Sequence, residues 1–315
     1  MVELALAAYA SETGTHLVRP PTDARWKRYL REFDAAAYER RLAERGCSFL
    51  PRSSPGFPPL LQAIHDPPPG LFLRGDVDVE LLSRPAVAIV GARACSGYGA
   101  SVARSFGREL AAAGLVIVSG LARGVDGEAH RGALAADGRT VAVLGCGIDR
   151  NYPAAHAELA RRVAVVSEYA PGVEPAPWRF PARNRIVAGL CAATIVVEAR
   201  ERSGALITAD LALEEGREVF AVPGEITSSL SAGTNDLLKL GASPLTRAAD
   251  VLSSYGIEPP EDESASSPLL DLLPATADEL ARRAALAAEE VARTLVELEL
   301  AGAVHCTEGV YRAAP

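Results

Sequence analysis

The stretch AVAIVGARACSGYGAS, residues 86–101, decides the fold class of this 315-residue chain. Small and β-branched apolar residues are followed by a turn that contains Gly91, Gly97 and Gly99, and a helical stretch then begins. A buried strand that leads through a turn into a helix is the first half of a βαβ unit. Because glycine lets backbone N–H groups come close to a ligand, the same turn indicates an anion-binding site.

Further apolar runs of the same kind follow, and amphipathic helical stretches separate most of them. Continuous Val/Ile runs that alternate with helices are typical of a parallel sheet covered on both faces, so we predict an α/β fold. Ligands of such sheets bind outside the carboxyl ends of the strands. The predicted strands are residues 86–90, 115–119, 140–145, 163–167, 194–199 and 218–223.

The composition divides the chain into four segments. Residues 1–83 are predicted to form a small N-terminal helical region, helical at 24–46, followed by a proline-rich extended connector. Residues 84–254 form the sheet core, and residues 255–267, rich in proline, serine and acids, form a linker. Residues 268–315 read as helix, helix and hairpin, which is the pattern of a winged-helix domain.

The net charge of -8 lies in the C-terminal segment. Residues 251–315 carry 12 acidic and 4 basic side chains, whereas residues 84–250 carry 17 and 18. Phosphate neutralisation dominates DNA affinity, so the acidic winged helix is not expected to read duplex DNA, and we expect a protein-contact or regulatory role. A nucleic-acid site in the balanced core must be a local arginine cluster.

Several classes of protein are disfavoured by the sequence. There is no apolar run of about 18 residues, so no membrane span is predicted. The N-terminus lacks the pattern of a signal peptide, and the five cysteines are scattered without a C-x-x-C pair. This pattern suits the reducing cytoplasm and argues against zinc, so we expect no metal and no cofactor.

Arginines gather where the predicted strands end. Arg93 follows the first strand and Arg123 the second, and five more arginines lie between residues 179 and 202. An arginine-lined crevice with backbone donors suits phosphates, either of one nucleotide or of a single strand. Tyr152 and Phe180 offer aromatic faces on which a base could stack.

No convincing catalytic set is found, and we predict that the protein is not an enzyme. Asp126 and His130 share a helical face and could form an acid–base pair or bind a metal. We prefer the simpler interpretation, in which Asp126 caps the helix and His130 makes a buried contact. A P-loop is excluded because neither Lys27 nor Lys239 follows a glycine.

Several blocks in order give the chain a specific resemblance to a known family. They include "AIVGARACSGYG", "VSGLARGVDGEAHRGAL", "AVLGCGIDRNYP", "FPARNRIVAGL" and "EARERSGALITADLALEEGREVFAVPGEI". From about residue 57 to 252 the chain resembles the DNA processing protein A (DprA/Smf) family, and its tail resembles the winged-helix domain of many members. Many members begin with a helical domain of the sterile-alpha-motif type, a pattern that residues 1–56 match poorly.

The resemblance implies an extended Rossmann-like core that binds single-stranded DNA as a homodimer. It also implies that the protein protects incoming strands and helps load RecA onto them in natural transformation, a form of DNA recombination linked to competence. The pocket would be built around Arg93, Arg183 and Arg185, and residues 232–245 would form the dimer contact. The candidate DNA-binding residues are Gly91, Arg93, Arg123, Arg179, Phe180, Arg183, Asn184, Arg185, Arg200, Arg202, Ser203 and Gly204.

One alternative function from another class stays open. A Rossmann-type nucleotide-binding hydrolase could use the same glycine turns for a mononucleotide, and the fold alone does not reject it. The missing P-loop lysine and the missing catalytic set make it the weaker hypothesis.

Overall fold

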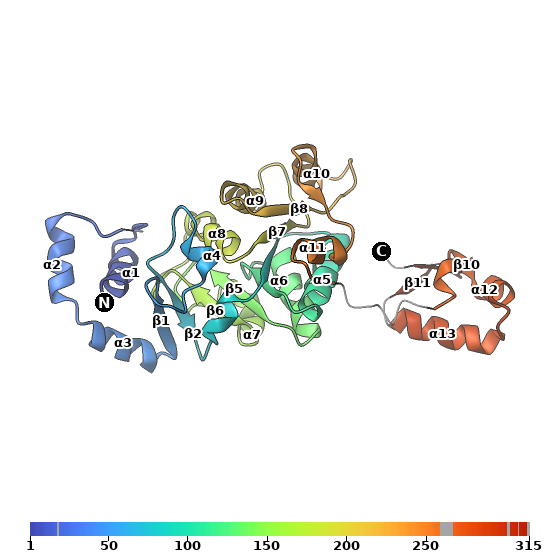
Figure 1. Cartoon of the computed structure of the whole chain (residues 1–315), viewed down its shortest axis with the longest axis horizontal. Helices are drawn as coiled ribbons and strands as arrows, with labels where there is room; N and C mark the ends of the chain where they lie inside the picture. The colour runs from blue at the N-terminus through green and yellow to red at the C-terminus, as the bar shows by residue number, and fades with distance from the viewer. Residues whose placement is uncertain (18, 259–266, 301–302, 308, 314–315) are drawn as a thin grey trace. The chain divides into compact units, whose positions relative to one another are not determined.

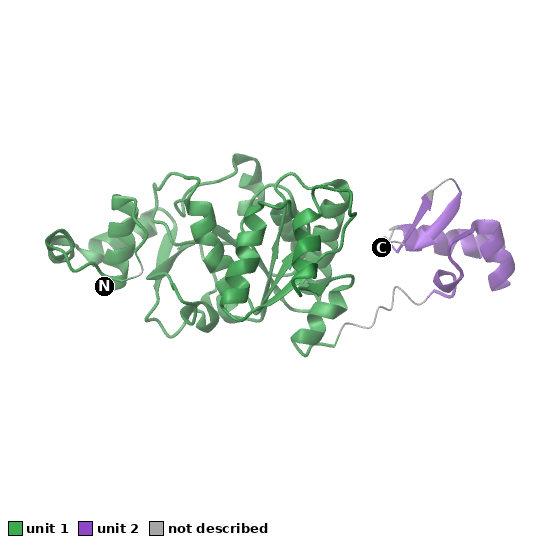
Figure 2. Ribbon diagram, turned by 90° about the horizontal axis from the view of Figure 1, so that it is seen from above, with its two compact units in different colours: residues 1–259 green, residues 260–315 purple. Residues whose placement is uncertain are grey.

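The computed structural model describes residues 1–17, 19–258, 267–300, 303–307 and 309–313. The chain divides into two compact units, residues 1–259 and 260–315 (Figure 2). Most of the predicted linker at 255–267, namely residues 259–266, lies outside the described residues. The predicted domain limits at residues 84 and 268 stay predictions.

A nine-stranded sheet runs through the first unit (Figure 1). Its strands are β1 (Cys47–Pro51), β2 (Gly70–Arg74), β3 (Ala86–Val90), β4 (Val116–Ser119), β5 (Thr140–Leu144), β6 (Ala164–Ser167), β7 (Ala193–Val196), β8 (Glu218–Ala221) and β9 (Ser243–Pro244). They lie in the order β1-β2-β6-β5-β4-β3-β7-β8-β9. All neighbours from β6 to β9 pair in parallel, whereas β1–β2 and β2–β6 are antiparallel. The predicted α/β class with a mostly parallel sheet is therefore confirmed.

The six predicted strands correspond to β3 to β8, but β1, β2 and the two-residue β9 were not predicted. β1 and β2 lie in the segment that was expected to be only an extended connector. Pro51 is the last residue of β1 and Pro69 directly precedes β2, positions where a missing N–H removes little from the ladder. The same segment also forms one turn of helix at Pro59–Gln62, where proline occupies the first helical position.

Helices cover both faces of the sheet. They are η1 (Val79–Ser83), α4 (Pro59–Gln62), α5 (Gly97–Ala112), α6 (Val125–Ala135), η2 (Ala154–His156), α7 (Ala157–Ala160), α8 (Arg179–Gly189), α9 (Gly204–Glu214), α10 (Ala232–Lys239) and α11 (Ala248–Ser254). Successive residues of a strand face opposite sides. Val87 and Ile89 of β3 therefore pack with α5, α6 and α11, while Ala88 and Val90 pack with α4, α8, α9 and α10.

Three helices precede the sheet: α1 (Val2–Thr13), α2 (Ala24–Glu32) and α3 (Ala35–Glu44). The prediction of helix at 24–46 is confirmed for α2 and α3, which Asp23 and Asp34 cap separately, while α1 was not predicted. Leu4 of α1 and Leu42 of α3 are buried in one cluster with Phe72 and Leu144 of the sheet. The helices at the N-terminus are thus packed against the core.

The second unit is a small winged-helix domain, as predicted. It contains η3 (Leu270–Leu272), β10 (Ala275–Thr276), α12 (Ala277–Ala284), α13 (Ala288–Leu300), β11 (Val304–Thr307) and β12 (Val310–Ala313). Its three strands lie in the order β10-β12-β11. Leu280, Val291 and Leu295 form its core, and Thr276 caps α12.

Within the described residues, no helix combines the length and the apolar character needed to cross a membrane.

Candidate nucleic-acid interface

The sheet has a topological switch point between β3 and β7. From β3 the chain proceeds through β4 to β6 on one side and returns through β7 to β9 on the other, so a crevice opens at the carboxyl ends. Two adjoining cavities, of about 460 Å³ and about 560 Å³, lie at this edge. We call them together the central crevice. The residues that line both are Arg93, Gly120, Ala122, Tyr152, Phe180 and Arg183.

The glycine turn after β3 forms one wall of the crevice. A Cβ at Gly91 would lie 2.7 Å from Val125 Cγ2, so glycine is required where the turn passes α6. The expected anion site at the start of α5, however, is already occupied by the protein itself. The buried carboxylate of Glu198 accepts from the Ser96 N–H at 2.9 Å, and Ser96 Oγ accepts from the Gly99 N–H at 3.0 Å.

An arginine and two aromatic rings stand in the middle of the crevice. The exposed Arg93 guanidinium lies 5.1 Å from the centre of the Phe180 ring, and Tyr152 stacks on Phe180 with centroids 5.3 Å apart. Phe180 thus already carries two partners, whereas Tyr152 is 42% exposed. Tyr152 therefore presents the more accessible aromatic face, and Arg93 places a cation against the same Phe180 ring.

Arg183 lies on the floor of the crevice and is 4% exposed. Its Nη1 donates to the carbonyl of Gly120 at 2.9 Å and to the carbonyl of Val143. Burial lowers the pKa of Arg183, and the nearby Asp126 opposes that shift. A Cβ at Gly120 would overlap the guanidinium, so this glycine makes room for Arg183. Part of the donor capacity of Arg183 is consequently used within the protein.

Arg185 does not line the central crevice. Its Nη2 donates to Glu168, and its Nε lies 3.3 Å from Asp66 Oδ2. Arg185 and Glu168 are buried and Asp66 is half-buried, and together they join α8 to the end of β6 and to the proline-rich segment. Asp66 in turn lies 2.7 Å from His16 Nε2. Arg183 and Arg185 belong to one helix and point in different directions because residues two apart do not share a helix face.

The other predicted DNA-binding residues are distributed over three places. Asn184, Ser203 and Gly204 line the cavity at the start of α9, and Arg123 lines the neighbouring cavity. Arg200 and Arg202 are exposed and line neither cavity.

Arg179 lines a different cavity, between the N-terminal helices and the loop after β6. The structure therefore brings together most of the predicted set, but it separates Arg179, Arg185, Arg200 and Arg202 from the crevice.

The expectation that Asp126 caps α6 is wrong, because the N-cap residue is Gly124. Asp126 instead accepts from the backbone N–H groups of Gly120 at 3.1 Å and Ala122 at 3.3 Å. Burial raises its pKa, although Arg183 and these backbone donors oppose the shift. The expected buried contact of His130 is confirmed: Nδ1 lies 2.6 Å from Thr140 Oγ1.

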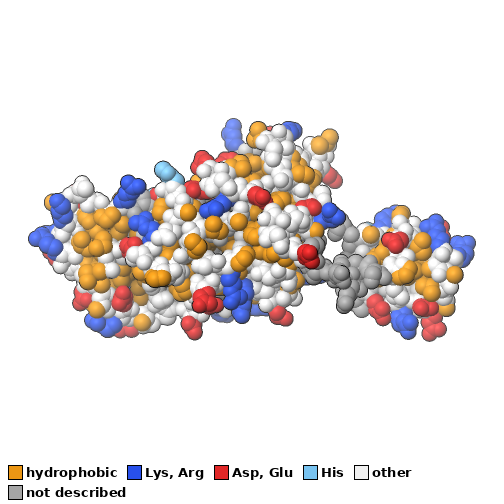
Figure 3. Space-filling model, viewed as in Figure 1, with side chains coloured by type: hydrophobic (Ala, Val, Ile, Leu, Met, Phe, Trp, Pro, Cys, Tyr) orange, Lys and Arg blue, Asp and Glu red, His pale blue; other side chains and the backbone are white. Residues whose placement is uncertain are grey.

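Sequence reasoning missed the backbone part of the crevice. Gly120, Ala122 and Asn151 line it, and the signal for the first two was their position directly after β4. The described residues contain no group of three or more His, Cys, Asp or Glu side chains arranged to hold a metal ion. Basic and acidic side chains are interspersed over the face of the first unit seen in Figure 3, so charge does not gather there.

Comparisons with known proteins agree with this geometry. Residues 48–256 match the family described as DNA recombination-mediator protein A, and residues 258–309 match the DprA winged helix domain. DNA processing protein DprA of Streptococcus pneumoniae is 48% identical over 199 residues, 62% of this chain and 70% of that protein. Protein Smf of Escherichia coli K12 is 40% identical over 286 residues, 83% of this chain and 76% of that protein.

Two solved structures are similar over most of their length. The X-ray structure of DprA from Streptococcus pneumoniae has a TM-score of 0.69 at 38% identity and covers 80% of this chain and 92% of that one. A Helicobacter pylori DNA processing protein A, whose structure is described by its single-stranded DNA binding mode, has a TM-score of 0.60 at 32% identity, covering 66% and 95%.

Proposed function

Since this chain belongs to the DNA recombination-mediator protein A (DprA/Smf) family, we propose that it binds single-stranded DNA in the central crevice and helps load RecA onto that strand. The observation that carries the proposal is the group formed by Arg93, Phe180 and Tyr152 at the topological switch point. It places a cation and an accessible aromatic ring against the same Phe180 side chain, and a phosphate and a base require these two kinds of group.

The proposed binding mode uses exposed groups for DNA and buried groups for support. Arg93 and Arg123 contact phosphates, and Tyr152 stacks a base, a contact worth roughly 1–3 kcal/mol. Arg183 supports the floor through Gly120 and Val143 and presents its remaining edge to the strand. The described Helicobacter pylori relative, with 32% identity, supports single-stranded DNA as the ligand.

The crevice gives no support to a nucleotide hydrolase. Among the described residues that line it there is one carboxylate, Asp126, and no lysine. Asp126 is occupied by the backbone N–H groups of Gly120 and Ala122, so it is poorly placed to activate water.

The test compares two exposed arginines at opposite ends of β3. Arg93→Glu should weaken binding of fluorescent oligo(dT) by about 1–3 kcal/mol, measured by anisotropy. Arg84 lies just before β3, at the amino end, so Arg84→Glu changes the charge equally and should leave the affinity unchanged. Equal affinity of the two variants would overturn the crevice as the DNA site.

Delivery of the strand to RecA in natural transformation is the next step of the proposal. It is tested by measuring RecA ATP hydrolysis on single strands that are already coated with a single-strand-binding protein. The wild-type protein should stimulate RecA there, whereas Arg93→Glu should not. We expect this work to take place in the cytoplasm, where the five free cysteines stay reduced.

We also propose a homodimer through the core, at the region that includes residues 232–245. Ile226 is 95% exposed and Leu240 85% exposed, which is unusual for large apolar side chains close together in sequence. The variant with both Ile226→Glu and Leu240→Glu should be monomeric by light scattering. Val296→Glu, an exposed apolar position in the winged-helix unit, is the control and should leave the dimer intact.

A further inference from the structure

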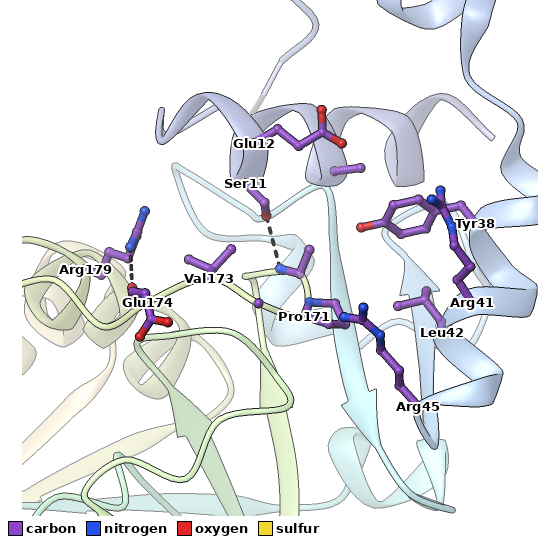
Figure 4. Close-up of a pocket in the computed structure, with 13 residues that line it drawn as sticks. Ser11, Glu12, Tyr38, Arg41, Leu42, Arg45, Pro171, Val173, Glu174 and Arg179 are labelled. Atoms are coloured by element: carbon purple, nitrogen blue, oxygen red, sulfur yellow. Dashed lines mark hydrogen bonds between the residues drawn. The ribbon is translucent and has the colours of Figure 1, made fainter.

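A second cavity of nucleotide size, about 530 Å³, lies at the N-terminal helices (Figure 4). We call it the N-terminal pocket. α1 provides Ser11 above it, α3 provides Tyr38 and Arg41 on one side with Arg45 directly after the helix, and the loop after β6 forms the opposite wall. Among the described residues, none lines both this pocket and the central crevice.

The walls of the N-terminal pocket are held together by specific contacts. The Ala170 N–H of the loop after β6 donates to Ser11 Oγ of α1 at 3.1 Å. Leu42 of α3 lies in the same buried cluster as Ala170. These contacts fix the position of α1 and α3 relative to the loop after β6, so the pocket is a defined part of the first unit.

The side chains that line the N-terminal pocket carry a net positive charge, because three arginines face two carboxylates, Glu12 and Glu174. Glu174 is paired with Arg150 at 2.5 Å, whereas Glu12 keeps its charge and accepts from the Tyr29 hydroxyl at 2.9 Å. Arg45 lies 4.0 Å from Asp149, whereas Arg41 forms no ion pair with any described residue. Arg179 forms no ion pair with a described residue either, so Arg41 and Arg179 are the cations available to an anionic group.

Aromatic rings accompany these arginines. The Arg41 guanidinium lies 5.1 Å from the Tyr38 ring centre, and that of Arg179 lies 4.8 Å from the Trp178 ring centre. Arginine beside an aromatic face is the arrangement that binds a phosphate and stacks a base. The central crevice has the same arrangement in Arg93 and Phe180.

The start of α8 connects the two sites. Arg179 lines the N-terminal pocket, and the next residue, Phe180, lines both cavities of the crevice. The loop after β6 also belongs to the same carboxyl edge of the sheet as the crevice. A strand that leaves the crevice past Phe180 therefore reaches the N-terminal pocket without crossing the sheet.

We propose that the N-terminal pocket is a second subsite for single-stranded DNA, which binds nucleotides that flank those in the central crevice. The inference rests on the proposed function and assigns the N-terminal helices a direct part in it. It predicts that affinity depends on strand length, since only a strand long enough to span both sites gains the second set of contacts.

The test measures the affinity of the full-length protein for oligo(dT) of about 6 and of about 15 nucleotides, lengths within the range of single-strand sites. Arg41→Glu should weaken binding of the long strand roughly 10-fold and leave the short strand unchanged. Its salt slope for the long strand should fall by about 0.7 for each phosphate that the variant no longer neutralises. Arg40→Glu, an exposed neighbour on α3 outside the pocket, is the matched control.

The possible outcomes distinguish failure of the second subsite from failure of the proposed function. If Arg41→Glu and Arg40→Glu give the same ratio of long-strand to short-strand affinity as the wild type, the subsite is refuted while crevice binding stands. If Arg93→Glu changes neither affinity, the proposed function itself fails. Competition by excess dTMP for the added affinity of the long strand would assign the pocket to a free mononucleotide and overturn the inference.

A second measurement does not depend on charge. A photoreactive phenylalanine analogue in place of Tyr38 should crosslink to the long strand and not to the short one. Equal crosslinking of both lengths, or none of either, contradicts the subsite. Circular dichroism melting of the variants checks that α3 stays folded.

Discussion

The loop after β3 and the middle of α8 both carry arginines that were expected to hold DNA, but their surroundings differ sharply. Arg93 is exposed and leans on an aromatic ring, whereas Arg185 is 7% exposed and meets two carboxylates. A buried charge must be matched by the protein, since leaving it unpaired is costly. An exposed arginine such as Arg93 is thus available to a ligand, whereas one matched to carboxylates, such as Arg185, maintains the fold.

The largest effect should come from breaking the buried group. Arg185→Ala leaves Glu168 without its cation, so the free energy of unfolding should fall by about 3–5 kcal/mol in urea titrations. Replacing both partners, Arg185→Met with Glu168→Leu, should restore much of that loss. If Arg185→Ala left the free energy of unfolding unchanged and reduced the DNA affinity, Arg185 would be a DNA-binding residue and not a residue that stabilises the fold.

The floor residue Arg183 should show both kinds of effect. Arg183→Ala leaves the carbonyls of Gly120 and Val143 without their donor, at a cost of about 1–3 kcal/mol in unfolding free energy. Oligo(dT) affinity should fall as well, because the same side chain lines the crevice. Arg93→Ala is the comparison and should reduce the oligo(dT) affinity without changing the free energy of unfolding. A loss of stability in Arg93→Ala would contradict the assignment of Arg93 to the ligand alone.

Protonation of the buried His130 should lower the stability of the interior and leave the crevice unchanged. The Thr140 hydroxyl donates to the Ile117 carbonyl, so it accepts from His130 Nδ1–H, and Nε2 is buried with no hydrogen-bond partner among the described residues. Burial lowers the pKa of His130 to about 3. The unfolded chain takes up this proton near its ordinary value, so stability is complete above about pH 6.5 and is lost as the pH falls toward 3.

Between pH 7 and about pH 5.5 the His130 contribution should lower the unfolding free energy by about 1.3 kcal/mol. His130→Gln removes the titrating group and should flatten this part of the stability profile. The oligo(dT) affinity of the folded protein should not follow the protonation of His130, because His130 lines neither cavity of the crevice and arginines do not titrate in this range. A loss of affinity that His130→Gln abolishes would contradict this separation, whereas one that persists in His130→Gln would be assigned to Asp126, the crevice carboxylate whose pKa is raised by burial.

The smallest effect is expected at the exposed arginine that lines no cavity. Arg200→Ala should change oligo(dT) affinity by less than about 0.5 kcal/mol and leave the melting temperature unchanged. Anisotropy beside Arg93→Ala measures the difference. A loss as large as that of Arg93→Ala would show that the strand runs over the loop between β7 and α9.

The sheet could be predicted from the sequence because its central strands are continuous runs of small and β-branched residues. β1 and β2 could not be predicted because prolines dominate their segment. Only the pairing of the strands in the structure shows that these prolines stand at strand ends. The family could be identified because the quoted motifs occur in order and contain the turns that follow β3, β4, β5 and β7.

Side-chain direction could not be predicted at the site. Pro181 favours a loop for "FPARNR", but proline is tolerated in the first turn of a helix, where its missing N–H is not needed. Once α8 begins at Arg179, the helical period sends Arg183 to the crevice and Arg185 into the interior. Glu198 likewise gave no sign in the sequence that it would cap α5.

The edge strand β9 has a consequence for how two copies can meet. It is two residues long and ends in Pro244, which has no N–H to offer a neighbouring strand. Such an edge resists continuation of the sheet into another molecule and so guards against strand-by-strand aggregation. A stable pair of copies at this end must therefore be joined by side chains such as Ile226 and Leu240, which point substitutions can separate without disturbing the sheet.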